Sequence, residues 1–550
     1  MSRKVLIVGG VAGGASAAAR LRRLDEEAEI IIFERGEHIS YANCGLPYYV
    51  SGVINERDAL LVQTPEAMRN RFRVDVRIYS EVTRVFPEEK VVEVQEQNGK
   101  VYRESYDQLI LSPGAAPLRP PIPGINDIEA FVVRNVTDID LIKKTIDEQK
   151  PQTAAVIGGG FIGLEMAENL HARGVETTII EMSNQVMAPF DYEMAAILHE
   201  HIFNKGVNLI LEDGVKSFTK KENGALITLQ SGQEVQSDLV IMAIGVKPEI
   251  KLAKEAGLTI GELGGIKVNE RLQTSDPNIY AVGDVIEVKH LVTGQAALLP
   301  LAGPANKQGR IVADVIVGRD SQYKGTQGTA IAKVFDLAAA STGANEKMLL
   351  KLGIPHVVSF THSNSHAGYY PGATRLSTKL IFDRSNGRIL GAQVVGAQGA
   401  DKRIDDIAGL IRHQGTVYDL QELELAYAPP FSAAKDPVNM AGYVAENIIN
   451  GDVRMIQWQE LSKLNAKDIC IVDVRDEEER RAKFIPGSLH IPIDNLRSRL
   501  AELPHDKEIV VYCEIGLRGY LAYRILAQHG FTNVRNLSGG WVTYYPAVFG

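Results

Sequence analysis

Two cysteines of this chain stand where a thiol could react. The sequence of 550 residues contains three cysteines, Cys44, Cys470 and Cys513. Cys44 lies in SYANCGLPYYVSG, residues 40–52, among turn-forming residues, and no second cysteine is close enough in sequence to form a disulfide with it. Its redox partner must come from elsewhere. Three alternatives follow: an exogenous thiol that forms a mixed disulfide, oxidation to a sulfenic acid, or an inert core cysteine.

Cys513 ends an apolar stretch and begins the loop CEIGLRG, residues 513–519, before a predicted helix. Such a loop gathers backbone N–H groups around the sulfur. Arg518 and the N-terminus of the helix would add positive charge beside it. The pattern therefore favours an anionic thiolate or persulfide at Cys513. Cys470 lies inside the predicted strand ICIVDV and is expected to belong to the core.

The elements that would position the first thiol begin at the N-terminus. Residues 4–34 read as an apolar strand, a glycine turn, a helix rich in Ala and Leu, and a second strand ending at Glu34. In this order a pyrophosphate rests on the helix N-terminus and the acid accepts hydrogen bonds from ribose hydroxyls. Val11 interrupts a strict GxGxxG, so only the first and last glycines match it. The glycines of the turn are Gly9, Gly10, Gly13 and Gly14.

A second copy of this pattern begins near residue 153, with Gly158, Gly160 and Gly163 in its turn and Glu181 at its end. Two copies predict two dinucleotides. Glu181 would accept hydrogen bonds from a 2′-hydroxyl and repel a 2′-phosphate, and the following MSNQ supplies no Arg or Lys. NADH is therefore expected in preference to NADPH. Glu165, on the helix behind this turn, could order the nicotinamide ribose or simply lie on the helix surface.

Three further stretches complete the order of motifs. YDQLILSPGAAP and DLVIMAIGVKPE each read as an apolar strand ending in a turn, and TSDPNIYAVGDV places Asp284 after a strand and a glycine. Together the motifs resemble the flavoprotein disulfide reductase family over about residues 1–445. The resemblance implies two nested Rossmann-like domains, the first for FAD and the second for NAD(P)H. The residues it assigns to these cofactors are Gly9, Gly10, Ala12, Gly13, Gly14, Glu34, Arg35, Ser40, Asn43, Ser112, Pro113, Gly114, Gly158, Gly160, Gly163, Glu181, Gly245, Gly283, Asp284, Pro300, Ala302 and Ala305.

The resemblance also implies domain boundaries within an α/β chain. The FAD domain would span residues 1–112 and 276–325, the NAD(P)H domain 113–275, and an α+β dimerisation domain 326–446. Residues 455–550 resemble the α/β rhodanese domain, through DICIVDVRDEEER, KFIPGSLHIPI and LSGGW together with the Cys513 loop. A phosphatase-like CX5R loop would need arginine where Gly519 stands, so sulfur chemistry is favoured over phosphoryl chemistry.

Ser40, Asn43 and Cys44 resemble the SxxxC pattern of coenzyme A disulfide reductases, whose cysteine cycles as a mixed disulfide with coenzyme A. NADH peroxidases and oxidases share this scaffold, but they usually carry a histidine in the first glycine turn, where this chain has Ala12. That difference argues against a sulfenic acid. Coenzyme A would need cations for its phosphoryl groups, although basic residues on helix faces are usually solvated. The candidates are Arg20, Arg23 and Arg71.

The predicted dimerisation domain contains tyrosines beside proline and glycine, in HAGYYPGA and LAYAPPFSAAKDPVNMAG. These segments resemble ones that reach across a homodimer to the partner's active cysteine. Tyr369 and Tyr427 are therefore expected to donate hydrogen bonds to the bound thiol, with Tyr370 as the alternative to Tyr369 and simple packing as the alternative role. The segment from Pro300 to Lys307 resembles the one whose helix N-terminus lies against the flavin and stabilises its reduced anion.

Composition excludes several classes of function. The net charge of −9 argues against a nucleic-acid partner. The sequence lacks the apolar run of a membrane span and the pattern of a signal peptide. Three scattered cysteines support neither a disulfide framework nor a cysteine zinc site, so we expect a cytoplasmic protein with reduced thiols and no metal.

These observations predict an NADH-dependent flavoprotein that reduces coenzyme A persulfide or polysulfide through Cys44 and releases sulfide. The rhodanese domain would collect sulfane sulfur on Cys513, from polysulfide or thiosulfate, and deliver it. Two alternatives stay open. One is a coenzyme A disulfide reductase that keeps the coenzyme A pool reduced, and the other is a sulfurtransferase hub with a regulatory reductase.

Overall fold

Residues 3–549 are described by a computed structural model, and they form two compact units. The first unit runs to Asn184 and resumes over Val207–Gly328. The second unit contains Gln185–Gly206 and continues from Thr329. No helix among the described residues is long and apolar enough to cross a membrane.

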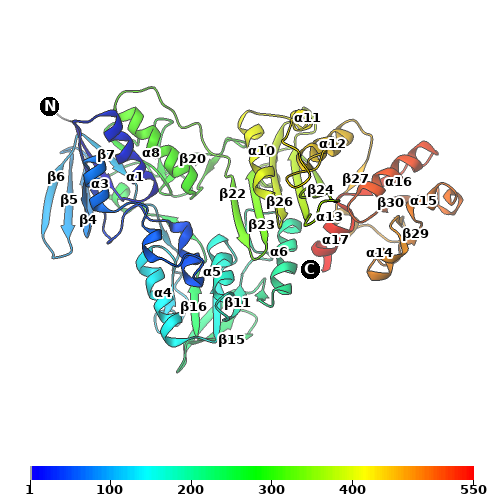
Figure 1. Ribbon diagram of the computed structural model, residues 1–550, viewed down its shortest axis with the longest axis horizontal. Helices are drawn as coiled ribbons and strands as arrows, with labels where there is room; N and C mark the ends of the chain where they lie inside the picture. The colour runs from blue at the N-terminus through cyan, green and yellow to red at the C-terminus, as the bar shows by residue number, and fades with distance from the viewer. Residues whose placement is uncertain (1–2, 550) are drawn as a thin grey trace. The chain divides into compact units, whose positions relative to one another are not determined.

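The first unit contains a parallel sheet in the order β19-β7-β1-β2-β3. Its strands are β1 (Lys4–Val8), β2 (Glu29–Phe33), β3 (Asp75–Arg77), β7 (Gln108–Leu111) and β19 (Ile279–Ala281). The central strands are apolar along their length because they are buried on both faces. Helices α1 (Ala12–Leu24) and α8 (Ala302–Ile316) lie side by side on it (Figure 1). Small residues permit this approach, since a Cβ at Gly309 would lie only 2.4 Å from the carbonyl oxygen of Gly13.

A second parallel sheet in the same unit has the order β12-β11-β10-β16-β9. Its strands are β9 (Ala130–Phe131), β10 (Thr153–Ile157), β11 (Glu176–Ile180), β12 (Asn208–Ile210) and β16 (Leu239–Met242). Helix α5 (Phe161–His171) connects β10 to β11 and packs on them, as a βαβ unit requires. The unit also holds α2 (Leu46–Ser51), α3 (Pro65–Phe72) and α4 (Val136–Gln149). Small antiparallel sheets complete it, of which the largest strands are β4 (Ser80–Phe86), β5 (Val91–Glu96), β13 (Val215–Lys220) and β14 (Ala225–Leu229).

The second unit begins with an antiparallel sheet in the order β22-β23-β26-β25-β24. Its strands are β22 (Ala330–Val334), β23 (Leu337–Gly343), β24 (Val357–Asn364), β25 (Arg375–Phe382) and β26 (Ile389–Gly396). Helices α10 (Ala400–Arg412) and α12 (Pro437–Ile449) pack on this sheet, and α11 (Val417–Glu422) packs on α12. Helix α6 (Tyr192–Asn204) also belongs to this unit, where it contacts β26.

The same unit ends in a parallel sheet of order β27-β31-β30-β28-β29. Its strands are β27 (Met455–Ile456), β28 (Ile469–Asp473), β29 (Leu489–His490), β30 (Glu508–Tyr512) and β31 (Val534–Leu537). The helices between and after them are α13 (Trp458–Leu461), α14 (Glu477–Ala482), α15 (Ile493–Leu496), α16 (Leu517–Gln528) and α17 (Gly540–Phe549). Parallel sheets with crossover helices at both ends of the chain confirm the predicted α/β class.

Candidate functional site

The first glycine turn is held tight by close backbone contacts. Gly9 has a φ of +93°, and a Cβ there would lie 2.2 Å from the carbonyl oxygen of Ser112. The Glu34 carboxylate accepts the Gly10 N–H at 3.2 Å, which fixes the acid beside the turn. Within the described chain, no side chain caps α1 and no acid lies in its first turn, so its free N–H groups suit an anion such as pyrophosphate. These residues fit the adenosine and pyrophosphate parts of FAD.

The other predicted FAD residues lie at the ends of neighbouring elements. The Gly283 N–H donates to the Gln308 side chain at 2.7 Å, and burial raises the pKa of the adjacent Asp284. Arg35 forms an ion pair with Glu249 at 2.8 Å. Ser112, Pro113 and Gly114 follow β7, and Ala12 and Gly13 begin α1. Pro300 precedes α8, and Ala302 and Ala305 lie at its start.

The second glycine turn has the same construction. Gly158 has a φ of +107°, and a Cβ there would lie 2.4 Å from the carbonyl oxygen of Ala243. At Gly160 a Cβ would meet no described protein atom within 4 Å, so the missing side chain leaves room for a ligand to approach the backbone. The Glu181 carboxylate accepts the N–H groups of Gly159 and Ser183, each at 2.8 Å. This turn fits a nicotinamide dinucleotide, and Glu181 is held beside it.

Cys44 lies in the short 3₁₀ turn Asn43–Gly45, directly before α2. Ser40 links this segment to the first glycine turn, because its N–H donates to the carbonyl oxygen of Gly10 at 2.8 Å. Ser40 has a φ of +46°, an uncommon backbone conformation for a residue with a side chain. Cys44 itself is exposed. The segment that carries Cys44 is therefore held beside the turn that fits FAD, and its thiol is free and exposed.

The charges around Cys44 oppose its ionisation. Partial withdrawal of the sulfur from water raises the pKa of the Cys44 thiol, and the carboxylates of Glu165 and Asp284 raise it further. Burial and the neighbouring Glu168 raise the pKa of Glu165 itself to about 7. A carboxyl group that titrates near neutral pH can donate or accept a proton at this site. The sequence suggested only a ribose or surface role for Glu165, because nothing local in it indicates the burial.

The cations predicted for coenzyme A differ in their surroundings. Arg20 donates to Asp314 at 2.8 and 3.0 Å, which joins α1 to α8. Arg23 and Arg71 are exposed at the C-terminal parts of α1 and α3. These two side chains are open to solvent, whereas that of Arg20 already has an ion-pair partner.

Tyr369 and Tyr427 come together in the second unit. Their hydroxyl groups lie 2.9 Å apart, and the residues are 77% and 48% exposed. Tyr370 instead packs edge-on against His366, with ring centroids 5.7 Å apart. Two exposed phenols that share a hydrogen bond form a donor group at the surface, while Tyr370 has a packing role. Their predicted contact with the thiol of a partner subunit stays a prediction.

The Cys513 loop follows β30 and is closed by glycines with left-handed backbone. The Gly516 N–H donates to the Cys513 sulfur at 3.1 Å, and Gly516 has a φ of +98°. The Trp541 N–H donates to the carbonyl oxygen of Cys513 at 2.8 Å, and a Cβ at Gly540 would lie 2.4 Å from that oxygen. Cys513 is buried. Its thiol therefore lies in a buried turn in which the Gly516 N–H points toward the sulfur and the Trp541 N–H fixes the backbone.

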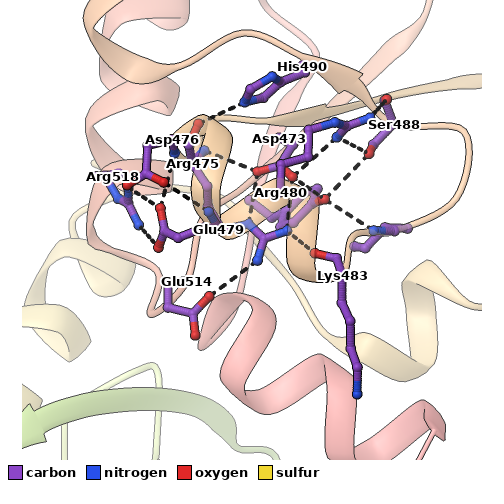
Figure 2. Close-up of polar contacts among 12 residues, drawn as sticks. Asp473, Arg475, Asp476, Glu479, Arg480, Lys483, Ser488, His490, Glu514 and Arg518 are labelled. Atoms are coloured by element: carbon purple, nitrogen blue, oxygen red, sulfur yellow. Dashed lines mark hydrogen bonds and ion pairs between the residues drawn. The ribbon is translucent and has the colours of Figure 1, made fainter.

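Carboxylates surround the arginines of this loop (Figure 2). The Arg518 guanidinium donates to both oxygens of Glu479, at 2.7 and 2.5 Å. Arg475 is buried and donates to Asp473, and it also reaches Glu514 at 3.3 Å. The sequence indicated Arg518 but not Glu479, which lies on a different helix. An acid at the third position of a predicted helix signals a capping box, but not a contact with a distant arginine.

Comparisons with known proteins agree with this geometry. Residues 3–309 match the family described as pyridine nucleotide-disulphide oxidoreductase, and residues 329–437 match the dimerisation domain of the same family. Residues 457–547 match the rhodanese-like domain. A coenzyme A disulfide reductase from Staphylococcus haemolyticus is 37% identical over 448 residues, which cover 81% of this chain and 100% of the relative.

Two solved structures extend the similarity over both units. Reduced CoADR-RHD from Bacillus anthracis is 55% identical, with a TM-score of 0.97, and the match covers 100% of this chain and 98% of that one. A NAD-dependent persulfide reductase from A. fulgidus is 39% identical, with a TM-score of 0.93, over 98% of this chain and 100% of that one. The chain therefore belongs to the pyridine nucleotide-disulphide oxidoreductase family of flavin-dependent enzymes, and its residues 457–547 form a rhodanese-like domain.

Proposed function

We propose that this enzyme uses NADH to reduce the sulfane sulfur of coenzyme A persulfide or of polysulfide, with Cys44 as the reacting thiol. The observation that carries the proposal is the second thiol site on the same chain, Cys513 in a loop whose Gly516 N–H donates to its sulfur. A sulfur-accepting loop on the same chain favours a sulfane-sulfur substrate over a plain disulfide. The similarity to a NAD-dependent persulfide reductase over both units supports this choice.

The thiol step follows from the setting of Cys44. The Cys44 thiolate attacks the sulfur of the persulfide that is bound to carbon, and hydrosulfide leaves with the electron pair of the broken S–S bond. A mixed disulfide between Cys44 and coenzyme A remains. FAD, when bound at the first glycine turn, supplies the two electrons from NADH that return this disulfide to two thiols. Cys44 needs no second cysteine for this cycle.

Side chains of this protein can donate and accept the protons that the thiol step requires. Glu165, with its pKa of about 7, can take the Cys44 proton before attack and return one to a leaving thiolate. Tyr369 and Tyr427, as an exposed hydrogen-bonded pair, would donate to the bound thiol from the partner subunit of a homodimer. Ser40 and Asn43 would hold the coenzyme A thiol end beside Cys44, and Arg23 and Arg71 are the exposed cations available for its phosphates.

A specific observation supports a second candidate, coenzyme A disulfide reduction. The coenzyme A disulfide reductase from S. haemolyticus matches this chain over 81% of its length. In this candidate Cys44 attacks a coenzyme A disulfide and two thiols are the products. The rhodanese-like domain would then be an accessory.

The test is NADH consumption by the holoenzyme with coenzyme A persulfide, polysulfide and coenzyme A disulfide in parallel, for wild type, Cys44→Ser and Cys513→Ser. We expect faster turnover of persulfide or polysulfide than of the disulfide, lost in Cys44→Ser. Cys513→Ser should slow turnover of polysulfide, which needs the second thiol, more than that of preformed coenzyme A persulfide. Faster turnover of the disulfide, unaffected by Cys513→Ser, would favour the second candidate and contradict the first.

A further inference from the structure

Arg518, the arginine of the Cys513 loop, already forms an ion pair with the carboxylate of Glu479. Glu479 lies in the first turn of α14, where its side chain accepts the Asp476 N–H at 3.0 Å and the Asp476 side chain accepts the Glu479 N–H at 3.0 Å. This capping box fixes the Glu479 side chain in place. Its two oxygens then receive both terminal nitrogens of Arg518, a bidentate geometry that makes a strong ion pair (Figure 2).

A second carboxylate is part of the loop itself. Glu514 follows Cys513 directly, and its side chain lies 3.3 Å from Arg475 and 4.0 Å from Arg375 of β25. Arg475 in turn is held by the buried Asp473 at 3.0 Å, and Arg480 lies 3.2 Å from the same carboxylate. Asp476 is a fourth carboxylate, 3.7 Å from Arg518. The four arginines around the loop therefore face four carboxylates among the described residues, and their charges balance.

The balance of charge around the Cys513 loop affects which sulfur donors can bind there. Thiosulfate carries two negative charges, and it releases sulfite when its outer sulfur is transferred. Binding this dianion therefore needs cations at the loop that have no carboxylate partner. Here it would approach Glu479 and Glu514 and compete with them for the arginines. Leu517, a residue of the loop that is 55% exposed, offers an apolar surface instead. An organic group could lie against it.

We propose that Glu479 and Glu514 set the donor specificity of the Cys513 loop: they exclude dianionic donors such as thiosulfate and admit donors with one negative charge at the reacting end, such as organic persulfides and the hydropolysulfide monoanion. This inference rests on the sulfur-accepting role of Cys513 in the proposed function, and it names the class of donor for that site. It replaces thiosulfate, which the sequence left open, with organic persulfides and related monoanions.

The transfer is balanced without an added oxidant or reductant. The Cys513 thiolate forms a bond to the outer sulfur of the donor, and the bond between that sulfur and the rest of the donor breaks. The electron pair leaves with the donor fragment, which is a thiolate from a persulfide, a sulfinate from a thiosulfonate and sulfite from thiosulfate. Cys513 keeps one extra sulfur as a persulfide, and total charge is unchanged in each case.

Methanethiosulfonate and thiosulfate test the role of charge, because they present the same type of S–S bond with one and two negative charges. We would measure, by mass spectrometry, the rate at which Cys513 gains one sulfur atom, without NADH and in the full chain carrying Cys44→Ser. Free cysteine gives the intrinsic reactivity of each donor, by which the rates are divided. Cys513→Ser identifies sulfur added elsewhere.

Glu479→Gln and Glu514→Gln are the informative variants, since glutamine at position 479 can still accept the Asp476 N–H. We expect each to raise the thiosulfate rate relative to the methanethiosulfonate rate by about tenfold, because one repelling charge is removed. Glu477→Gln is the matched control: it removes an equal charge from the same helix, but Glu477 pairs with Arg481 and is exposed. It should change the ratio by less than about twofold.

Two results would overturn the inference alone. One is a corrected rate in the unmodified loop that is equal for both donors; the other is a ratio that neither Glu479→Gln nor Glu514→Gln changes. Loading of Cys513 by neither donor would overturn the inference together with the sulfurtransferase part of the proposed function. Normal loading with no NADH-dependent reduction of persulfide would overturn the proposed function and leave this inference standing.

Discussion

At the scale of single residues, the pKa of Cys44 depends on the carboxylates beside it. Partial withdrawal of the sulfur from water raises the pKa of this thiol most, and Glu165 and Asp284 raise it further. Glu165→Gln removes one negative charge near the sulfur, so we expect the pKa of Cys44 to fall. The pH dependence of the alkylation rate of Cys44 measures this pKa. Glu176→Gln, at an exposed position on β11, is the control, and an unchanged pKa in Glu165→Gln would exclude the coupling.

The preference for NADH over NADPH is also expected to depend on one residue, Glu181. Glu181 is held by the N–H groups of Gly159 and Ser183, so its charge stays where the ribose of the cofactor would lie. We expect Glu181→Gln to raise kcat/KM for NADPH relative to NADH by about tenfold, because repulsion of the 2′-phosphate is removed. Steady-state kinetics with both cofactors check it. The same change in Glu176→Gln would show a general effect of surface charge instead.

At the scale of elements, β25 carries a buried cation that connects three segments. The Lys379 ammonium, with no exposed surface, lies 2.9 Å from Asp191, 2.5 Å from Glu193 and 2.6 Å from Glu346. The three carboxylates alone have the spacing of a metal site, but the ammonium lies among them. This cluster joins α6 and α9 (Glu346–Lys351) to the antiparallel sheet.

Replacing this lysine should destabilise the sheet strongly. Lys379→Met leaves three buried carboxylates without their cation, and we expect a loss of about 3–5 kcal/mol in unfolding free energy at neutral pH. Although burial opposes ionisation, His356 and Lys379 lower the pKa of Glu346 to about 2. Its contribution is therefore present above the unfolded pKa and lost as the pH falls through about 2. In Lys379→Met the loss should shrink in acid.

Urea unfolding of the wild type and of Lys379→Met, at neutral and at acidic pH, measures the difference in unfolding free energy between them. Lys351→Met, at an exposed position at the end of α9, serves as the control. A loss in Lys379→Met that stays the same at acidic pH would indicate a packing effect rather than unpaired charge.

At the scale of the whole chain, the rhodanese-like domain is joined to the dimerisation sheet within the second unit. His362 of β24 hydrogen bonds with Ser377 and with Thr543 of α17, each at 2.9 Å. The Gln457 side chain donates to the Val358 carbonyl oxygen at 3.1 Å. Burial, with a smaller effect of the nearby Arg375, lowers the pKa of His362 to about 3. A neutral imidazole therefore connects the two domains.

This junction should weaken in mild acid. The unfolded pKa of histidine is about 6.5, above the folded value, so the contribution of His362 is present above about pH 6.5 and is lost as the pH falls below it. We expect the second unit to lose up to about 1.4 kcal/mol per pH unit from this group between about pH 6.5 and 5. His362→Gln should reduce that slope. His413→Gln, an exposed histidine, should leave it unchanged, and equal slopes in all three proteins would contradict the prediction.

Much of the fold follows from short stretches of sequence. The two dinucleotide turns, the Cys513 loop and the order of domains could be predicted because each depends on local backbone constraints. Gly9 and Gly158 need left-handed φ angles and close approach to a neighbouring strand, and those demands appear in the sequence as glycine after an apolar run. The family, which the order of motifs indicated by resemblance, and the α/β class are confirmed.

The electrostatics of both thiol sites could not be predicted, because they join residues that are far apart in the chain. Glu165 acts on Cys44 from another βαβ unit, and Glu479 reaches Arg518 from a helix that precedes it by more than one strand. The sequence by itself therefore determined the family and the fold class, and it singled out two candidate thiols, because these depend on short local motifs. Only the tertiary structure decided which charges surround them, since long-range packing brings a carboxylate to an arginine or a thiol regardless of their separation in sequence.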